Sequence, residues 1–129
     1  FYNTQLREQL STLRKQLPGA DIVYVNQYDI VYDFFANPSN YGFKATTQAC
    51  CGLGGKYSFT WGAQCGLTGT VDGKSVTVGS CSDPASYIIW DGIHLTDQAN
   101  RVLTKQILTG KFFEPSTFSI SNRCQIQPI

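Results

Sequence analysis

Several features that mark other classes of protein are missing from this sequence. No apolar run approaches the roughly 18 residues that a membrane-spanning helix needs, so no such helix is expected. The ten Lys and Arg residues are spread along the chain and the net charge is +1, which argues against the basic patch of a nucleic-acid-binding protein. The first residues have neither the charged leader nor the apolar block of a signal peptide, so we expect any export signal to lie outside these 129 residues.

Histidine is nearly absent: His94 is the only one, and Asp91 stands three positions before it. The histidine side chain has an unperturbed pKa of roughly 6.5, so it can take and return a proton near neutral pH. A carboxylate that accepts a hydrogen bond from one ring nitrogen leaves the other nitrogen available as a base. With Gly92 between them, Asp91 and His94 can meet in this way. The alternative is a surface or capping pair without a role in catalysis.

The five cysteines favour an oxidising compartment. They are Cys50, Cys51, Cys65, Cys81 and Cys124. The adjacent Cys50 and Cys51 make a poor zinc motif, because zinc ligands are usually separated by two or more residues, so we expect disulfides. Two bridges and one spare cysteine can be arranged in about fifteen ways (five choices of the spare, three pairings of the rest). Cys124 is our candidate for the spare, which would bond to another chain.

The first part of the chain predicts a helix, a strand and a second helix. Leucines recur every three or four positions over residues 4–17, which indicates an amphipathic helix that covers one face of a sheet or, less favoured, binds a partner. Residues 22–25 are a short apolar run, typical of a strand buried on both faces of a parallel sheet. Asp29 is expected to cap the second helix. The residues expected to face inward are Ile30, Val31, Phe34 and Phe35.

This order of elements indicates an α/β protein, although a sheet cannot be built from the single core strand that the pattern predicts. Residues 42–83 have a different character, rich in glycine, cysteine and threonine. Within them, residues 69–78 predict a hairpin that turns at Asp72 and Gly73. A cluster of aromatic side chains either lines a ligand groove or, the favoured alternative, packs beneath the disulfides. The cluster consists of Tyr57, Phe59 and Trp61.

The last third of the chain carries the Asp91–His94 loop between two helical segments. A helical turn is expected to start at residues 82–84, and residues 87–89 are expected to form a turn that leads into the loop. Thr96 and Asp97 can cap the last helix. Its inward face is expected to consist of Ala99, Val102, Leu103 and Ile107.

The block Trp90-Asp91-Gly92-Ile93-His94-Leu95-Thr96 resembles the last sequence block of the plant GDSL esterase/lipases, a branch of the SGNH hydrolases. Residues 20–25, 37–43, 49–52 and 81–84 resemble other segments of that family in the right order, and the likeness runs from about residue 2 to about residue 118. The resemblance implies that Asp91 and His94 belong to a Ser-His-Asp triad. It also implies an ester substrate, with no cofactor and no metal. Ile93 and Leu95 flank His94 and either contact the acyl chain or are simply buried.

The sequence departs from the family in one important respect. The family's nucleophile lies in a Gly-Asp-Ser motif, and its other oxyanion-hole groups lie in two further upstream blocks; none of these occurs here. The resemblance therefore implies the C-terminal part of one SGNH-type three-layer α/β/α domain, a flavodoxin-like parallel-sheet fold. A missing N-terminal segment or chain of the same precursor would complete the sheet and supply the serine. In this interpretation residues 42–83 are a disulfide-rich excursion from the domain, and the chain alone is inactive.

Three functions remain open from the sequence. The first is the histidine- and aspartate-bearing part of a secreted or vacuolar carboxylic ester hydrolase that works with an N-terminal chain. The second is a non-catalytic GDSL-like protein that binds a lipid, a sugar or a protein, as a defence protein would. The third is a small disulfide-linked module that works alone, which is the least favoured because the leucine face and the strand both need a sheet that this chain does not contain.

Overall fold

The structure is a computed structural model, and it describes residues 1–120. The chain divides into two compact units. The terminal unit consists of residues 1–27 together with the described residues from 106 onward, and the central unit consists of residues 28–105. That the whole chain is part of one domain stays a prediction.

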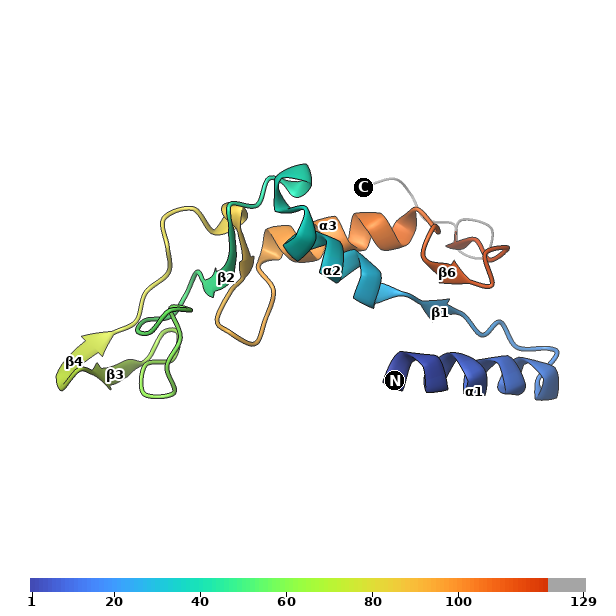
Figure 1. The fold of residues 1–129 in the computed structure, drawn as a ribbon, viewed down its shortest axis with the longest axis horizontal. Helices are drawn as coiled ribbons and strands as arrows, with labels where there is room; N and C mark the ends of the chain where they lie inside the picture. Colours follow the sequence, from blue (N-terminus) through green and yellow to red (C-terminus); the bar gives the residue numbers. More distant parts are fainter. Residues whose placement is uncertain (121–129) are drawn as a thin grey trace. The chain divides into compact units, whose positions relative to one another are not determined.

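The terminal unit begins with helix α1 (Tyr2–Gln16), which confirms the predicted helix with two more residues at its start (Figure 1). Its leucine face is not covered as expected. No residue of α1 is buried, and Leu13 and Leu17 are 38% and 47% exposed. Isolated helices gain most of their stability from packing of an apolar face. Leu6 and Leu10 are half-buried, so the described residues cover the leucine face only in part.

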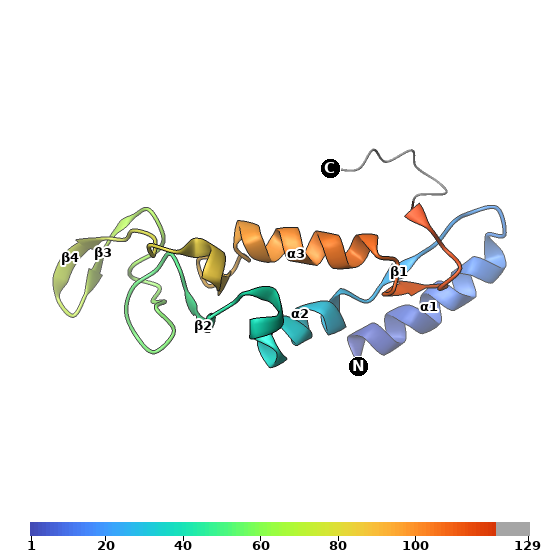
Figure 2. The same cartoon turned by 90° about the horizontal axis from the view of Figure 1, so that it is seen from above.

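Strand β1 (Tyr24–Val25) is shorter than predicted, and its pairing corrects the sequence interpretation. It pairs antiparallel with β6 (Phe113–Glu114), with Tyr24 opposite Glu114, rather than parallel with a neighbour (Figure 2). Arg14 of α1 holds this pair, because its Nε donates to the carbonyl of Ile22 at 2.8 Å and its Nη2 to that of Glu114 at 2.6 Å. An apolar run shows that a strand is buried but not which strand lies beside it, which is why the direction was wrong.

The central unit opens with helix α2 (Gln27–Ala36) and the 3-10 turn Pro38–Tyr41. Ile30 and Phe34 are buried as predicted, and the ring of Phe34 packs against Phe43 at 5.5 Å between centroids. Two details of the prediction are wrong. The helix begins before Asp29, which therefore lies in the first turn and is not the cap, and Phe35 is 38% exposed.

Two strands of the central unit, β2 (Ala45–Ala49) and β5 (Tyr87–Ile89), pair in parallel and lead into the loop that carries Asp91 and His94. Ala45 lies opposite Tyr87 and Ala49 opposite Ile89. The predicted turn at residues 87–89 is wrong, because these residues form a strand, and the sequence analysis did not predict β2. Helix α3 (Asp97–Leu108) follows β5 through the loop that carries His94, with Ala99 and Leu103 buried. Helices combined with parallel and antiparallel strands make the chain an α/β protein, as predicted.

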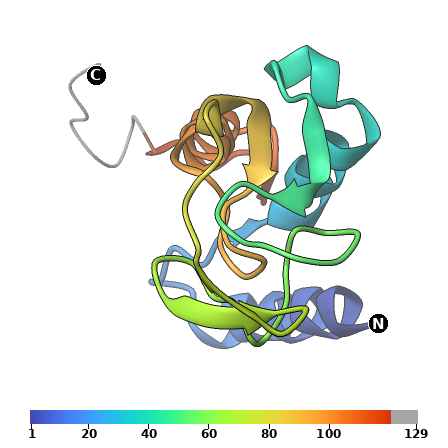
Figure 3. The same ribbon diagram turned by 90° about the vertical axis from the view of Figure 1, so that its left-hand side faces the viewer.

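The cysteine-rich segment adds a hairpin, β3 (Thr68–Val71) and β4 (Lys74–Thr77), at the end of the central unit that faces the viewer in Figure 3. Asp72 and Gly73 have φ of 50° and 75°, the two left-handed residues of a type I′ turn, so the predicted hairpin is confirmed. Two disulfides, Cys50–Cys81 and Cys51–Cys65, tie the segment to the end of β2. Cys124 lies outside the described residues. In residues 1–120, no helix is both long enough and apolar enough to cross a membrane.

Candidate active site

The loop at residues 90–94 is held by backbone hydrogen bonds that continue the β2–β5 pairing. The backbone N–H groups of Cys50 and Cys51 donate to the carbonyls of Ile89 and Trp90 at 3.0 and 2.6 Å. The Trp90 N–H then donates to the His94 carbonyl at 2.8 Å, which closes the loop. The two cysteines that follow β2 thus fix the residue directly before Asp91.

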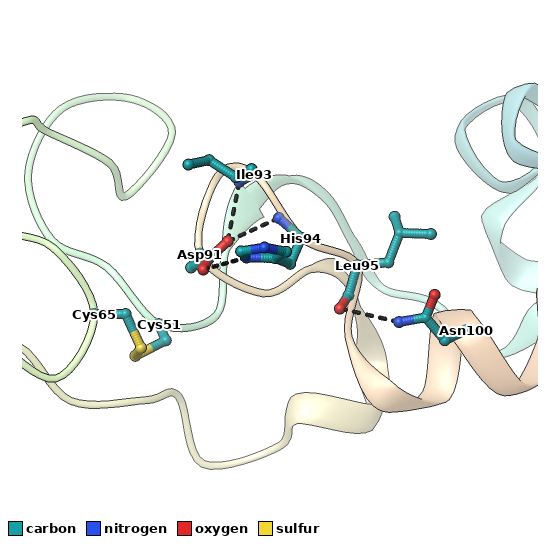
Figure 4. Close-up of polar contacts among 7 residues, drawn as sticks. All are labelled: Cys51, Cys65, Asp91, Ile93, His94, Leu95 and Asn100. Carbon is teal, nitrogen blue, oxygen red and sulfur yellow. Dashed lines mark hydrogen bonds and ion pairs between the residues drawn. A yellow bond between two sulfur atoms is a disulfide. The ribbon is translucent and has the colours of Figure 1, made fainter.

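Asp91 and His94 point toward one another within this loop (Figure 4). The Asp91 Oδ1 atom accepts hydrogen bonds from the backbone N–H of Ile93 at 3.0 Å and of His94 at 2.8 Å. Its other oxygen, Oδ2, lies 2.7 Å from Nδ1 of the His94 ring. One oxygen of the carboxylate thus caps the turn and the other contacts the imidazole, and a catalytic role of the pair stays a prediction.

The electrostatic setting keeps Asp91 ionised. Partial burial alone would raise the pKa of its carboxyl group, whose side chain is 20% exposed. The hydrogen bonds from the His94 ring and from the backbone N–H groups of His94 and Ile93 outweigh this, so the pKa of Asp91 lies below its ordinary value of 3.8. A carboxylate next to Nδ1 favours the tautomer with its proton on Nδ1. This leaves Nε2 as an acceptor on a ring that is 69% exposed.

Thr96 anchors the far side of the loop. Its hydroxyl donates to the Tyr87 carbonyl at 2.7 Å and accepts from the Ala99 N–H at 3.1 Å, which confirms the predicted cap of α3. Thr96 is 1% exposed, so the hydroxyl joins β5 to α3 in the interior of the unit. The Asn100 side chain adds a hydrogen bond to the Leu95 carbonyl at 3.4 Å (Figure 4). The Asp91–His94 loop is thus held at both ends.

The residues that flank His94 differ in exposure. The Ile93 side chain is 74% exposed and lies on the side of the loop away from the imidazole (Figure 4). Leu95 is half-buried and forms a β-bridge with Ile89. Their contact with an acyl chain stays a prediction, for which Ile93 has the more accessible side chain.

The sequence analysis missed the contact between Gly92 and Phe59. Gly92 has φ of 88°, the left-handed region that glycine tolerates, and a Cβ placed on it would lie 2.6 Å from Cδ2 of Phe59. The ring of Phe59 therefore rests on the backbone between Asp91 and His94. The Asp-Gly pair signals a tight turn, but nothing local to it indicates that a ring 33 positions upstream would cover it.

Gly92→Ala is expected to lower the free energy of unfolding by about 2 kcal/mol, because it combines a left-handed conformation with a clash against Phe59. The distance between Asp91 and His94 should change as well, since their geometry depends on this turn. Gly79→Ala is the matched control: a Cβ there meets no atom within 4 Å, and we expect a change within about 0.5 kcal/mol. Denaturant unfolding of the two variants measures the difference, and equal effects would show that Phe59 does not constrain the turn.

Within residues 1–120, no group of three or more His, Cys, Asp or Glu side chains is arranged to hold a metal ion. Four of the cysteines are bonded in pairs, and the Cys51–Cys65 bridge lies near the Asp91–His94 loop (Figure 4).

Comparison with known proteins identifies the class. The model of the GDSL-like lipase/acylhydrolase family matches residues 2–107. GDSL esterase/lipase ENOD8 of Medicago truncatula is 42% identical over 124 residues, 96% of this chain and 32% of that protein. Sinapine esterase of Brassica napus is 38% identical over 116 residues (89% and 28%), and alpha-L-fucosidase 3 of Arabidopsis thaliana is 36% identical over 110 residues (84% and 30%). No solved structure matches.

The carboxylate and imidazole of Asp91 and His94 lie on a loop after a parallel strand, and the matched family is one of lipases and acylhydrolases. This chain belongs to the GDSL-like lipase/acylhydrolase family. It spans only about 30% of the length of the relatives described above.

Proposed function

We propose that this chain supplies the histidine and aspartate of a Ser-His-Asp triad in a carboxylic ester hydrolase, and that the serine lies on an N-terminal part of the same precursor. The observation that carries the proposal is the contact of 2.7 Å between Asp91 Oδ2 and His94 Nδ1. The backbone hydrogen bonds to Oδ1 support it, because they fix the carboxylate before any substrate arrives.

The mechanism follows from the open nitrogen of His94. Nε2 takes the proton of the serine hydroxyl as its oxygen attacks the ester carbonyl, and it later gives that proton to the leaving alcohol. Asp91 holds the ring in the required tautomer and stabilises the imidazolium that forms. Donors on the N-terminal part hold the oxyanion, and a water molecule, activated by the same nitrogen, then releases the acid. No step needs a metal or a cofactor.

Two observations support a nucleophile from outside the described residues. The relatives are about three times as long as this chain, and the leucine face of α1 is covered only in part. An N-terminal segment or chain that bears Gly-Asp-Ser would cover that face and place its serine at His94. Cys124 is the cysteine we assign to a bond between the two parts.

The two disulfides support an oxidising location, either secreted or vacuolar. The proposed substrate class is a carboxylic ester. Relatives of similar identity are named for different substrates, one as a sinapine esterase and another as an alpha-L-fucosidase, so no particular substrate transfers to this chain.

The pH dependence of hydrolysis tests the role of His94. We call this chain together with its Gly-Asp-Ser part the assembled enzyme. Only a neutral imidazole accepts the serine proton, and histidines in general lose that form below about pH 6.5, so kcat should fall toward acid pH. The Asp91 carboxylate stays ionised through that range, because its pKa lies below 3.8 and protonation begins only at more acid pH. A kcat that falls toward acid pH, measured with a simple acetate ester, is the expected result.

A flat profile over that range would exclude His94 as the base. An N-terminal part in which another residue replaces the serine would favour instead the non-catalytic binding protein of the second hypothesis. The sequence of any chain that co-purifies with this one distinguishes the two cases directly.

A further inference from the structure

We propose that Phe59 and Trp61 form an aromatic platform beside His94 that binds an aryl group of the ester, a specificity site that deepens, and rests on, the proposed hydrolase function. The sequence favoured packing of this cluster beneath the disulfides. That prediction is wrong for two of its members, because Trp61 is 78% exposed and Tyr57 52% exposed. An indole with that much surface in water is poised to bury it against something else.

The platform is attached to the catalytic turn by the contact described above. The ring of Phe59 rests on Gly92, so closely that a single Cβ there would lie 2.6 Å from it. Trp61 packs on Phe59 with ring centroids 5.5 Å apart and ring planes at 72°, an edge-to-face pair. One residue, Ile93, lies between Gly92 and His94, which places their α-carbons at most about 7 Å apart. A group on the platform and a carbonyl at His94 therefore need only a short linker between them.

The surface between these two points is apolar and accessible. Ile93 is 74% exposed and stands between Gly92 and His94 in the chain. Tyr57 is set apart from the platform by its own partner, since the Lys56 ammonium lies 5.4 Å from the centre of its ring. The structure thus offers a partly exposed phenyl ring and a largely exposed indole against the Asp91–His94 turn, while the exposed Ile93 side chain lies on the other side of the loop.

An aromatic occupant fits this surface better than a saturated one of equal size. Edge-to-face and offset contacts between rings add to the gain from buried area, and the added term corresponds to about three- to tenfold in binding. The aryl group can belong to the acyl part or to the alcohol part of the ester. Both place a ring a few atoms from the carbonyl, so the experiment distinguishes the two sources.

The test uses matched pairs of esters that differ only in whether the ring is aromatic. Methyl hydrocinnamate against methyl cyclohexylpropionate probes the acyl side, and benzyl acetate against cyclohexylmethyl acetate probes the alcohol side. In the assembled enzyme, kcat/KM should favour the aromatic ester about three- to tenfold in one of the two pairs. Trp61→Leu should bring that ratio to about one. Tyr32→Leu is the control, because Tyr32 is an aromatic residue of α2 with 62% exposure, and it should leave the ratio unchanged.

A binding measurement separates this inference from the proposed function. The chain has two tryptophans, Trp61 and Trp90, so ¹⁵N-labelled protein shows two indole N–H signals, and Trp61→Leu identifies one of them. Hydrocinnamide should move the Trp61 signal saturably, and cyclohexylpropionamide should move it much less. Hydrolysis of both esters with an unmoved Trp61 signal, or with ratios of about one in both pairs, would overturn the inference. A saturable shift without hydrolysis would support the aryl site and refute the esterase. The absence of both the shift and hydrolysis would refute both proposals.

Discussion

Asp91→Asn is expected to lower the kcat of the assembled enzyme by about 10⁴-fold, as loss of the orienting aspartate does in serine hydrolases generally. The amide oxygen can still accept the backbone N–H groups of Ile93 and His94, so the turn should survive. The amide nitrogen, however, carries hydrogens, and it would donate to Nδ1 of His94 where the carboxylate now accepts from it at 2.7 Å. The ring proton would move to Nε2, and the base would be lost.

Asp97→Asn is the matched control for this variant. Asp97 lies in the first turn of α3, its side chain is 84% exposed, and its only role in the described structure is an ion pair of 2.7 Å with Arg101. Exposed pairs of this kind contribute little, so kcat should change less than about twofold. Hydrolysis of one ester by both variants measures the effect. Activity of Asp91→Asn within about tenfold of the native protein would contradict the triad.

Removal of the disulfides is the second change with a large expected effect. Cys50 and Cys81 are 31 positions apart and Cys51 and Cys65 are 14 apart. Because closing a longer loop removes more entropy from the unfolded chain, replacing the first pair by serine should cost about 4 kcal/mol of stability and the second about 3 kcal/mol. The backbone N–H groups of Cys50 and Cys51 also hydrogen-bond to the carbonyls of Ile89 and Trp90. As denaturant is added to these variants, activity should therefore fall before the central unit unfolds.

Denaturant unfolding and hydrolysis of the two double variants measure both effects. The rank order is the internal control, since the chemistry of substitution is the same at each pair. Stability that is unchanged in both variants would show that the bridges do not constrain the central unit. Activity that stays constant until global unfolding would show that Cys50 and Cys51 do not position the Asp91–His94 turn.

Local patterns predicted those parts of the fold that depend on neighbours in the sequence. The spacing of leucines gave α1, Asp72 and Gly73 gave the hairpin turn, and Thr96 gave the start of α3. The contact of Asp91 with His94 belongs to this group, because only three positions separate the two residues and a glycine lies between them.

Parts that depend on distant residues were missed or misassigned. Strand β2 has the sequence Ala-Thr-Thr-Gln-Ala, with little apolar character, and its partner β5 lies about forty positions further along. The Phe59–Gly92 contact likewise joins the cysteine-rich segment to the catalytic turn, and no period of two or 3.6 residues reports it. The leucine face of α1 is the opposite case: the pattern was read correctly, but the described residues cover the face only in part.

The central claim is that His94 activates a serine that lies outside this chain. A fluorophosphonate reacts with a serine only when a base activates that serine, so its attachment reports activation without any assumption about the ester. We predict that the reagent labels the Gly-Asp-Ser part only when this chain is present, and that His94→Ala in this chain abolishes the labelling. Labelling that persists with His94→Ala, or that occurs on the Gly-Asp-Ser part alone, would contradict the account.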